Sequence, residues 1–483
     1  MARADKSWLH AGAVLEGEIG TIRRTAPRFF ALGYPAPYAV AASSLGFQMV
    51  YRIMNSASEL ACERFFDLET APPRRPLRTA ESGFPASGAA AIGFSVACET
   101  ELARVAALLE AAELGPLAAL RGPDDPAVIA GGPLTLLDPR LLAAIADAVV
   151  VGEAEEALPL LRDAVARAGD KGDLLDRLAQ GVPGTWVPGR GAAPPEPAIA
   201  ELEALPAAST GWSPRAELKN LFLVEAARGC ARGCAFCVLA GRTAGKRAFR
   251  PVPVGRVLAA IPDGASGVGL VGAAVTDHPE IDELVARIVA SGKRVSLSSV
   301  RADRLTPGLV ARLAAGGMRS LTLAADGASE RIRSAIRKGL TADDLRRAAS
   351  LAAEAGIRRL KVYAMVGLPT ETDDDVAELA ALLRDLATHL EVVAAVQAFV
   401  PKPGTPLAAA EMTPLPDLRR RLDLLKRLST RRYRVSPTSP RWSWVDWRLA
   451  HAKERAGEIA VAAHRGGGGF AAWKAAIEAH LEP

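Results

Sequence analysis

Three cysteines in one short stretch have the spacing of a metal-cluster site. Cys230, Cys234 and Cys237 form a C-x3-C-x2-C pattern directly after the apolar run 221–224, which predicts a loop at the end of a strand. Closely spaced thiolates bind iron–sulfur clusters, whereas a structural zinc site needs four ligands, and the nearest downstream histidine is His278. The spacing therefore predicts a [4Fe-4S] cluster with three protein thiolates. Such a cluster leaves one iron open to a small molecule, as a catalytic site requires.

The composition is that of an α/β protein with an ample core and only a slight excess of positive charge. The 483 residues are enough for two or three domains, and 49% of them are hydrophobic. Lys and Arg number 59 against 54 Asp and Glu, and a net charge of +5 over this length does not indicate a nucleic-acid partner. Because the sequence shows neither a membrane-spanning run nor a signal peptide, we expect a cytoplasmic protein with no membrane partner. The two remaining cysteines, Cys62 and Cys98, are expected to stay reduced there.

The elements that would position this site begin with an N-terminal domain over residues 1–190. Helical patterns at 43–55 and 99–114 alternate with β-rich runs, which lie at 29–33, 89–96, 127–130 and 148–151. This alternation predicts a doubly wound, Rossmann-like fold in which helices cover both faces of a parallel sheet. Ligands of such sheets bind at the carboxyl ends of the strands. The turns 131–133 and 152–153 would lie at that edge.

A linker over residues 191–215 is predicted to lead into a full or partial (β/α) barrel over residues 216–408. Its expected strands are 221–224, 267–271, 295–300, 321–324, 360–366 and 392–399, and helical patterns at 281–290, 307–315, 342–355 and 373–387 separate them. Barrel active sites occupy the carboxyl-terminal face. The cysteine loop follows the first strand, so we expect it on that rim.

Residues 409–483 are predicted to form a small helical C-terminal region. Helical patterns cover 418–428, 454–463 and 470–480. The region is rich in tryptophan, with Trp442, Trp444, Trp447 and Trp473. Because tryptophan combines a large apolar surface with one polar group, this cluster favours a docking core.

The cysteine loop resembles the cluster motif of the radical S-adenosylmethionine (radical SAM) superfamily, down to the aromatic Phe236 before the third cysteine. The resemblance covers roughly residues 220–405. It implies that the open iron chelates the amino and carboxylate groups of S-adenosylmethionine (SAM). It also implies that an electron from the reduced cluster cleaves SAM to methionine and a 5′-deoxyadenosyl radical. An electron donor such as flavodoxin or ferredoxin would be the partner.

The resemblance makes Phe236 a candidate cofactor contact, and further motifs that resemble the family contribute candidate SAM contacts. Gly272 and Ala273 stand where the family has a glycine-rich turn, without its acidic third residue. Asp326, at a strand end, matches the position of a glutamate that reaches the SAM ribose or amino group. Ser299 and Arg301, at the end of the preceding strand, are candidates for hydroxyl or carboxylate contacts.

The strand 360–366 and the turn after it also resemble the family. Alternation places Lys361 and Tyr363 on one face of the strand, which can be the lumen of a barrel. Gly367 belongs to the turn whose backbone, in the family, packs along the adenine. Glu371 is expected to cap the next helix. Lys361 and Gly367 are candidate cofactor contacts, and Tyr363 and His278 are the candidates for a catalytic side chain.

The N-terminal turns and the tail segment 452–473 resemble a group of radical SAM proteins with an N-terminal cobalamin-binding-like domain. The D-x-H-x-x-G signature of cobalamin domains is absent, and no histidine lies between His10 and His278. Two interpretations therefore stay open. Either cobalamin binds without a histidine from this domain, or the domain docks a partner.

The leading hypothesis is a radical SAM enzyme that generates a 5′-deoxyadenosyl radical or, with cobalamin, transfers a methyl group from SAM to an unactivated carbon or phosphorus. One alternative is a tRNA methylthiotransferase, which carries a second three-cysteine cluster in its N-terminal domain. Only Cys62 and Cys98 are available there. Another alternative is a non-catalytic iron–sulfur sensor or binding protein. The sequence does not indicate the substrate.

Overall fold

The computed structural model describes residues 11–67, 76–200, 202, 207–240, 249–298 and 300–481. These residues form two compact units. The N-terminal unit takes its residues from Met1–Glu201, Ala207–Asn220 and Arg448–Pro483, and the barrel unit takes its residues from Leu202–Pro206 and Leu221–Trp447.

The units differ from the predicted boundaries in two places. Much of the predicted linker packs into the N-terminal unit, where the Thr210 N–H donates to Gln48 Oε1 over 3.0 Å and Trp212 forms an antiparallel bridge with Ile19. The predicted C-terminal region is divided inside helix α14 (Pro440–Ala450). Residues up to Trp447 belong with the barrel, and the rest belong with the N-terminal unit.

The N-terminal unit contains a six-stranded sheet in the order β2-β1-β3-β4-β5-β6, in which only β6 is antiparallel. Its strands are β1 (Arg28–Tyr34), β2 (Leu60–Phe66), β3 (Ala91–Ser95), β4 (Ala127–Gly131), β5 (Ala148–Val150) and β6 (Thr185–Trp186). The order of the first five is that of flavodoxin-like doubly wound sheets. The predicted Rossmann-like fold is thus confirmed.

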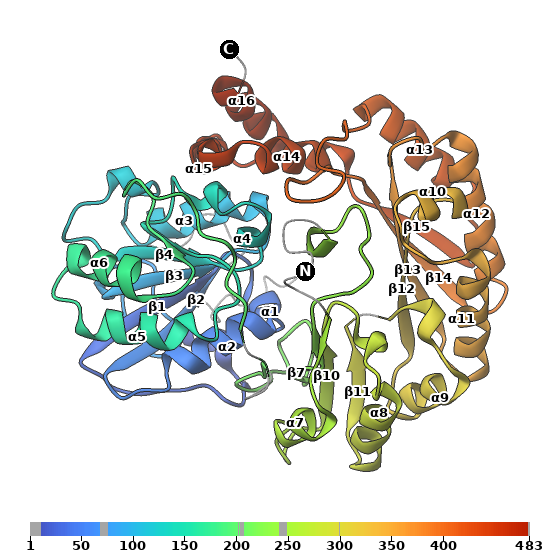
Figure 1. Cartoon of the computed structure of the whole chain (residues 1–483), viewed down its shortest axis with the longest axis horizontal. Helices are drawn as coiled ribbons and strands as arrows, with labels where there is room; N and C mark the ends of the chain where they lie inside the picture. Colours follow the sequence, from blue (N-terminus) through green and yellow to red (C-terminus); the bar gives the residue numbers. More distant parts are fainter. Residues whose placement is uncertain are drawn as a thin grey trace, which may run out of the picture. The chain divides into compact units, whose positions relative to one another are not determined.

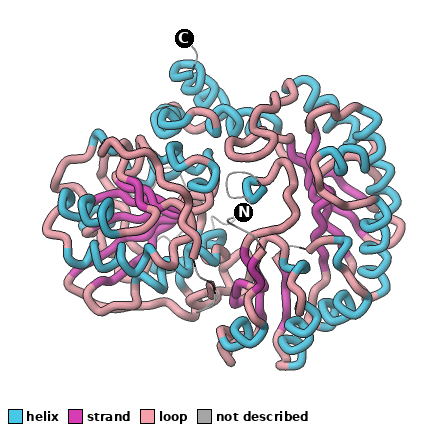
Figure 2. The backbone as a smooth tube through the Cα atoms, in the orientation of Figure 1, coloured by secondary structure: helices cyan, strands magenta, loops and turns pink. Residues whose placement is uncertain are grey.

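Helices cover both faces of this sheet, with α2 and α5 on one face and α3 on the other (Figures 1 and 2). The helices are α1 (Tyr38–Ala41), α2 (Leu45–Met54), α3 (Leu102–Ala111), α4 (Leu134–Leu137), α5 (Ala157–Arg167) and α6 (Lys171–Gly181). From the C-terminal segment, α15 (Ala456–Arg465) packs on α3, and α16 (Phe470–Leu481) packs on α15. The Nε of Arg465 donates to Glu110 Oε1 over 2.9 Å, which ties α15 to the end of α3.

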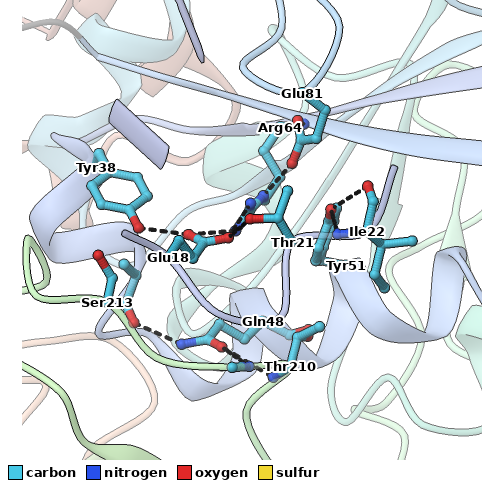
Figure 3. Close-up of polar contacts among 12 residues, drawn as sticks. Glu18, Thr21, Ile22, Tyr38, Gln48, Tyr51, Arg64, Glu81, Thr210 and Ser213 are labelled. Carbon is cyan, nitrogen blue, oxygen red and sulfur yellow. Dashed lines mark hydrogen bonds and ion pairs between the residues drawn. The ribbon is translucent and has the colours of Figure 1, made fainter. Parts of the chain in front are cut away.

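Strand β2 was not predicted, because charged residues interrupt its apolar run. Arg64 lies in the middle of β2 with a side chain that is only 4% exposed. Its guanidinium donates to Glu81 Oε1 and to Glu18 Oε1, each over 2.6 Å, and lies 4.2 Å from the centre of the Tyr51 ring (Figure 3). Buried charge is tolerated only when it is paired and hydrogen-bonded. These partners come from distant segments, so the strand is visible only in the folded chain.

The barrel unit is a partial (β/α) barrel of parallel strands, as predicted. Strands β7, β10 and β11 form one sheet, and β12 to β15 form a second, with a parallel bridge between Val300 and Leu323 joining them. The strands are β7 (Phe222–Glu225), β10 (Gly267–Val271), β11 (Arg294–Leu297), β12 (Ser320–Asp326), β13 (Arg359–Val366), β14 (Glu391–Ala398) and β15 (Tyr433–Pro437). Of these, β15 was not predicted.

Helices line the outer side of this curved row of strands (Figure 1). They are α7 (Val254–Ala259), α8 (Ile281–Ala290), α9 (Pro307–Ala315), α10 (Glu330–Ala335), α11 (Ala342–Glu354), α12 (Asp373–Leu386) and α13 (Leu415–Arg427). Along β13, burial alternates, and Leu360 and Val362 are buried while Lys361 and Tyr363 are not. Lys361 and Tyr363 therefore share a face, as the sequence predicts. Among the described residues, no helix is long and apolar enough to cross a membrane.

Candidate cluster and cofactor site

The three cysteines lie on a tight loop at the carboxyl end of β7. After β7 the chain forms the short strand β8 (Ala227–Arg228), which pairs with β9 (Arg250–Pro251). Gly229 and Gly233, on either side of Cys230, have φ values of +78° and +70°, which only glycine adopts at little cost. The Cys237 N–H donates to Cys234 O over 3.0 Å. The cysteine loop therefore turns back on itself at the predicted rim.

The chemistry of this loop fits a cluster. Burial raises the pKa of the Cys234 thiol, nearby Lys338 opposes that rise, and Asp326 and the other two thiols add to it. The thiols are thus close enough to influence one another. Within the described ranges, no three metal-ligating side chains converge on a single ion. A four-iron cluster binds each thiolate through a different iron, so its ligands stand further apart than those of one ion. That the three cysteines are ligands stays a prediction.

Phe236 anchors the cysteine loop to the barrel. Its side chain packs against a buried cluster that contains Ile332, Ile336, Leu368 and Phe399. Those residues come from α10, from the turn after β13 and from the end of β14, so one aromatic ring connects the loop to three neighbouring segments. Phe236 was predicted as a cofactor-binding residue, and the structure gives it an apolar packing role.

Backbone hydrogen bonds reinforce this anchor. The Ala235 N–H donates to Ile336 O over 2.9 Å, and the Leu407 N–H donates to Ala235 O over 3.1 Å. Ala235 lies between Cys234 and Phe236. These two bonds therefore fix the part of the loop between the second and third cysteines.

An ion-pair network fixes the other half of the loop. Arg232, between the first two cysteines, donates from Nε and Nη2 to the two carboxylate oxygens of Asp277, over 2.9 and 2.5 Å. Asp277 also accepts from Arg304 Nε over 3.0 Å. Asp303 lies 3.6 Å from Arg232 and accepts from Arg301 Nε over 2.9 Å. The network joins the cysteine loop to the segments that follow β10 and β11.

The pair Asp326–Lys338 lies beside the thiols. Asp326 ends β12 after a bulge and has φ of +60°, an uncommon conformation for a residue with a side chain. Lys338 Nζ donates to Asp326 Oδ2 over 2.5 Å, and both side chains are largely buried. Asp326 was predicted as a site residue. Lys338 was not, although it lies in the segment 323–339 that resembles the family.

Arg333 holds the segment between Asp326 and Lys338 through hydrogen bonds to backbone carbonyl groups. Its side chain is fully buried, its Nε donates to Leu340 O over 3.0 Å, and its Nη1 donates to Gly327 O over 3.4 Å. One guanidinium thereby holds both ends of the segment that presents the Asp326–Lys338 pair. Within the described residues its Nη2 has no hydrogen-bond partner.

The predicted SAM-contact residues after β10 and β11 lie on the same rim. Gly272 exchanges hydrogen bonds of 3.2 Å with the Ser298 hydroxyl, and a Cβ at Gly272 would meet Ala227 O at 2.6 Å. A residue without a side chain is therefore needed there for close approach to β8. Ala273 is exposed. Arg301 joins the ion-pair network, and Ser299 lies outside the described residues.

The face of β13 carries Lys361 and Tyr363 as a pair, with Lys361 Nζ 4.8 Å from the centre of the Tyr363 ring. A hydrogen bond to Glu371 holds the turn after β13. Gly367 has φ of +87°, and its N–H donates to Glu371 Oε1 over 2.7 Å. Glu371 was expected to cap α12, but it accepts from Gly367 and from Arg421 Nη1 instead. Asp375 takes the capping role with Thr372.

His278 has a structural role, which speaks against the catalytic role considered for it. His278 is only 2% exposed. Nδ1 accepts from the Glu280 N–H over 3.0 Å, so the hydrogen lies on Nε2, which donates to Val252 O over 2.9 Å. Both ring nitrogens are therefore engaged with backbone groups.

Comparisons with known proteins agree with this architecture. Residues 46–188 match the family profile for the N-terminal part of radical SAM proteins, and residues 224–383 match the radical SAM superfamily. An uncharacterised protein of Methanocaldococcus jannaschii is 34% identical over 194 residues, which are 39% of this chain and 43% of that protein.

Two solved structures of the cobalamin-dependent SAM radical enzyme OxsB share the fold. With aqua-cobalamin bound, OxsB matches with a TM-score of 0.51 and 14% identity over 76% of this chain and 53% of the OxsB chain. Apo OxsB matches with a TM-score of 0.50 and 13% identity over 91% and 72% of the two chains. The chain thus spans less than two thirds of the archaeal relative and of the cobalamin-bound OxsB chain. The two matched profiles, the partial barrel and the cysteine loop on its rim show that the chain belongs to the radical SAM superfamily, a family that implies a [4Fe-4S] cluster and SAM.

Proposed function

We propose that this chain cleaves SAM reductively at a [4Fe-4S] cluster held by Cys230, Cys234 and Cys237. The observation that carries the proposal is the position of all three cysteines on one anchored loop at the carboxyl end of β7, in a barrel of parallel strands. Active sites of such barrels lie on that face. When bound, the reduced cluster supplies the electron that breaks the sulfonium bond of SAM.

The residues of the chain would bind the cluster and SAM, orient them and enclose them. Phe236 and the Arg232–Asp277 pair hold the loop in place, so that the three thiolates are presented with little reorganisation. Asp326, which accepts a hydrogen bond from Lys338, would orient the ribose or the amino group of SAM. The Gly367 turn would provide the backbone surface along the adenine. An electron donor such as flavodoxin or ferredoxin would reduce the cluster.

Anaerobic reconstitution with iron and sulfide tests the proposal. The wild-type chain should gain iron–sulfur absorbance and form 5′-deoxyadenosine from SAM in the presence of dithionite. A cluster without SAM cleavage would instead support an iron–sulfur sensor or binding protein. Absence of any cluster would refute the proposal.

A tRNA methylthiotransferase gains no support from the N-terminal unit. Cys62 is buried within β2, and Cys98 is exposed after β3. Such enzymes carry three cysteines for a second cluster, and only these two are available. The same reconstitution checks this point, because one cluster per chain corresponds to about four iron atoms.

Cobalamin-dependent methyl transfer is the second candidate, favoured by the fold shared with OxsB. The sheet order supports a ligand at its carboxyl edge, where the turns at Gly132 and Gly152 lie. Any cobalt ligand from residues 11–277 would have to be a group other than histidine. The test is the absorbance and mass spectrum of small molecules that copurify when cobalamin is supplied. A bound corrinoid at one per chain supports the candidate, and none after anaerobic reconstitution contradicts it.

A further inference from the structure

A pocket lined by arginine and threonine lies at the opposite end of the barrel unit from the cysteine loop. Its cavity volume is about 310 Å³, and it is lined by Arg384, Ala387, Thr388, Thr430, Arg431 and Arg432. Residues 430–432 precede β15, and residues 384–388 precede β14. The pocket therefore lies at the amino ends of these parallel strands, whereas the cysteine loop follows the carboxyl end of β7. It is separate from the proposed SAM site.

Among the described residues, the three arginines of this pocket have no acidic partner. In the part of the chain that the structure describes, Arg384, Arg431 and Arg432 form no ion pair, and all three are exposed. Two acidic residues on the adjoining segments are paired with other arginines. Asp385 pairs with Arg346 over 3.0 Å, and Glu391 pairs with Arg359 over 3.0 Å. The pocket thus concentrates three uncompensated positive charges.

Helix electrostatics account for only one of these charges. Arg384 lies in the last turn of α12, where a cation interacts favourably with the helix dipole. Arg431 and Arg432 lie in the loop between α13 and β15, so this explanation does not apply to them.

The loop that carries the two arginines is internally fixed. The Thr430 hydroxyl accepts from the N–H groups of Arg432 and Tyr433, each over 3.3 Å. The Tyr433 hydroxyl donates to Leu428 O over 2.5 Å, and the Val392 N–H donates to Arg432 O over 3.0 Å. A turn ordered in this way presents its side chains at a lower entropic cost on binding.

We infer that this pocket binds a phosphate group, either as inorganic phosphate or on a small phosphorylated molecule. Arginine forks match phosphate oxygens in bidentate hydrogen bonds, and threonine hydroxyls supply further donors. The cavity is near the lower end of the roughly 300–1,000 Å³ that is usual for small-molecule sites. It can therefore hold more than the phosphate alone.

Calorimetric titration of the full-length chain with inorganic phosphate and with pyrophosphate tests the inference, at ionic strength matched with sodium chloride. We expect a dissociation constant below about 1 mM for at least one of the two probes. Arg384→Gln and Arg431→Gln should each weaken binding by about tenfold or more, which corresponds to about 1.4 kcal/mol. The two arginines lie on different elements, so misfolding of one variant leaves the other as a test.

Arg419→Gln is the matched control. Arg419 is an exposed arginine on α13 that does not line the pocket, and its loss should change the affinity by less than about twofold. Equal weakening by all three variants would overturn the site and indicate a diffuse charge effect. Tighter binding of a short single-stranded oligonucleotide, unaffected by Arg384→Gln and Arg431→Gln, would also overturn it. Because this readout requires no cluster and no SAM, its failure is distinguishable from failure of the proposed function.

Discussion

Asp277 connects the cysteine loop to two other segments of the barrel rim. Burial raises the pKa of its carboxyl group, but the hydrogen bonds and charges of Arg232, Arg301 and Arg304 outweigh burial and hold that pKa below its ordinary value. The ionised form of the Asp277 carboxyl group is therefore more favourable in the folded chain than in the unfolded chain. Its role is to fix Arg232, and with it the first half of the loop.

Asp277→Asn should lower the free energy of unfolding by about 2 kcal/mol, because hydrogen bonds between charged groups are lost at a largely buried position. Asp282→Asn is the control, since Asp282 pairs with Arg312 where both side chains are about half exposed. Its loss should cost less than about 1 kcal/mol. Chemical denaturation of both variants decides the point, and equal losses would contradict a special role for Asp277.

Glu371 is a buried carboxyl group with an elevated pKa. Burial raises its pKa to about 7, although the Gly367 N–H and Arg421 oppose the rise. Between its unfolded value of about 4.5 and about 7, the folded chain binds more protons than the unfolded chain. The contribution of Glu371 to the free energy of unfolding therefore falls as pH rises through this window, and it is constant above it.

The stability difference between wild type and Glu371→Gln should consequently shift by about 3 kcal/mol between pH 4.5 and pH 7.5, in the direction that disfavours wild type at the higher pH. Urea denaturation at several pH values measures this shift. A difference that does not change with pH would mean that Glu371 is ionised throughout, stabilised by Arg421.

Element ends on the rim depend on close backbone approach, and the turn after β13 is the clearest case. Gly367 has φ of +87°, and a Cβ there would meet Leu418 Cδ2 at 2.5 Å. The Thr413 hydroxyl donates to Gly367 O over 3.0 Å. The turn is thus pressed against α13, which supports the proposed adenine surface.

Gly367→Ala should lower the free energy of unfolding by about 3 kcal/mol, from the left-handed conformation and the overpacking together. Gly356→Ala separates the two causes. Gly356 has φ of +81° with nothing within 4 Å of its Cβ position, so it should cost only about 1 kcal/mol. Thermal unfolding of the two variants measures both costs. Equal costs would show that the turn after β13 accommodates the added methyl group without overpacking.

The elements predicted from sequence were those with uninterrupted periodicity. The predicted strand 267–271 and the helices 281–290 and 307–315 match β10, α8 and α9 residue for residue. Strand β2 was missed because Arg64 interrupts its apolar run and finds its partners only in the folded chain. In the site, the cysteine spacing was readable directly. The Asp326–Lys338 pair was not, because it depends on the turn that Arg333 holds.

At the scale of the whole chain, the C-terminal segment completes the N-terminal unit. Helix α15 packs on α3, and Ile459 is fully buried there. The sequence placed residues 409–483 together because helical patterns recur through the region at 418–428, 454–463 and 470–480, and such a pattern shows which face is buried but not against what. The division inside α14 therefore required the structure.

Ile459→Ala should lower hydrogen-exchange protection in α3 and leave the amides of β13 unchanged, with a cost of about 3 kcal/mol in the N-terminal unit. Leu379→Ala, at a fully buried position in α12, should give the reverse pattern. Loss of protection in β13 on Ile459→Ala would contradict the assignment of this segment to the N-terminal unit.

We propose that one anchored loop, through its three cysteines, makes this chain a SAM-cleaving enzyme. The most direct test is formation of 5′-deoxyadenosine by reconstituted wild type and by the single variants Cys230→Ala, Cys234→Ala and Cys237→Ala, with Cys98→Ala as the matched control. We expect 5′-deoxyadenosine from wild type and from Cys98→Ala, and only background amounts from the other three variants. Wild-type rates in any of those three would contradict it.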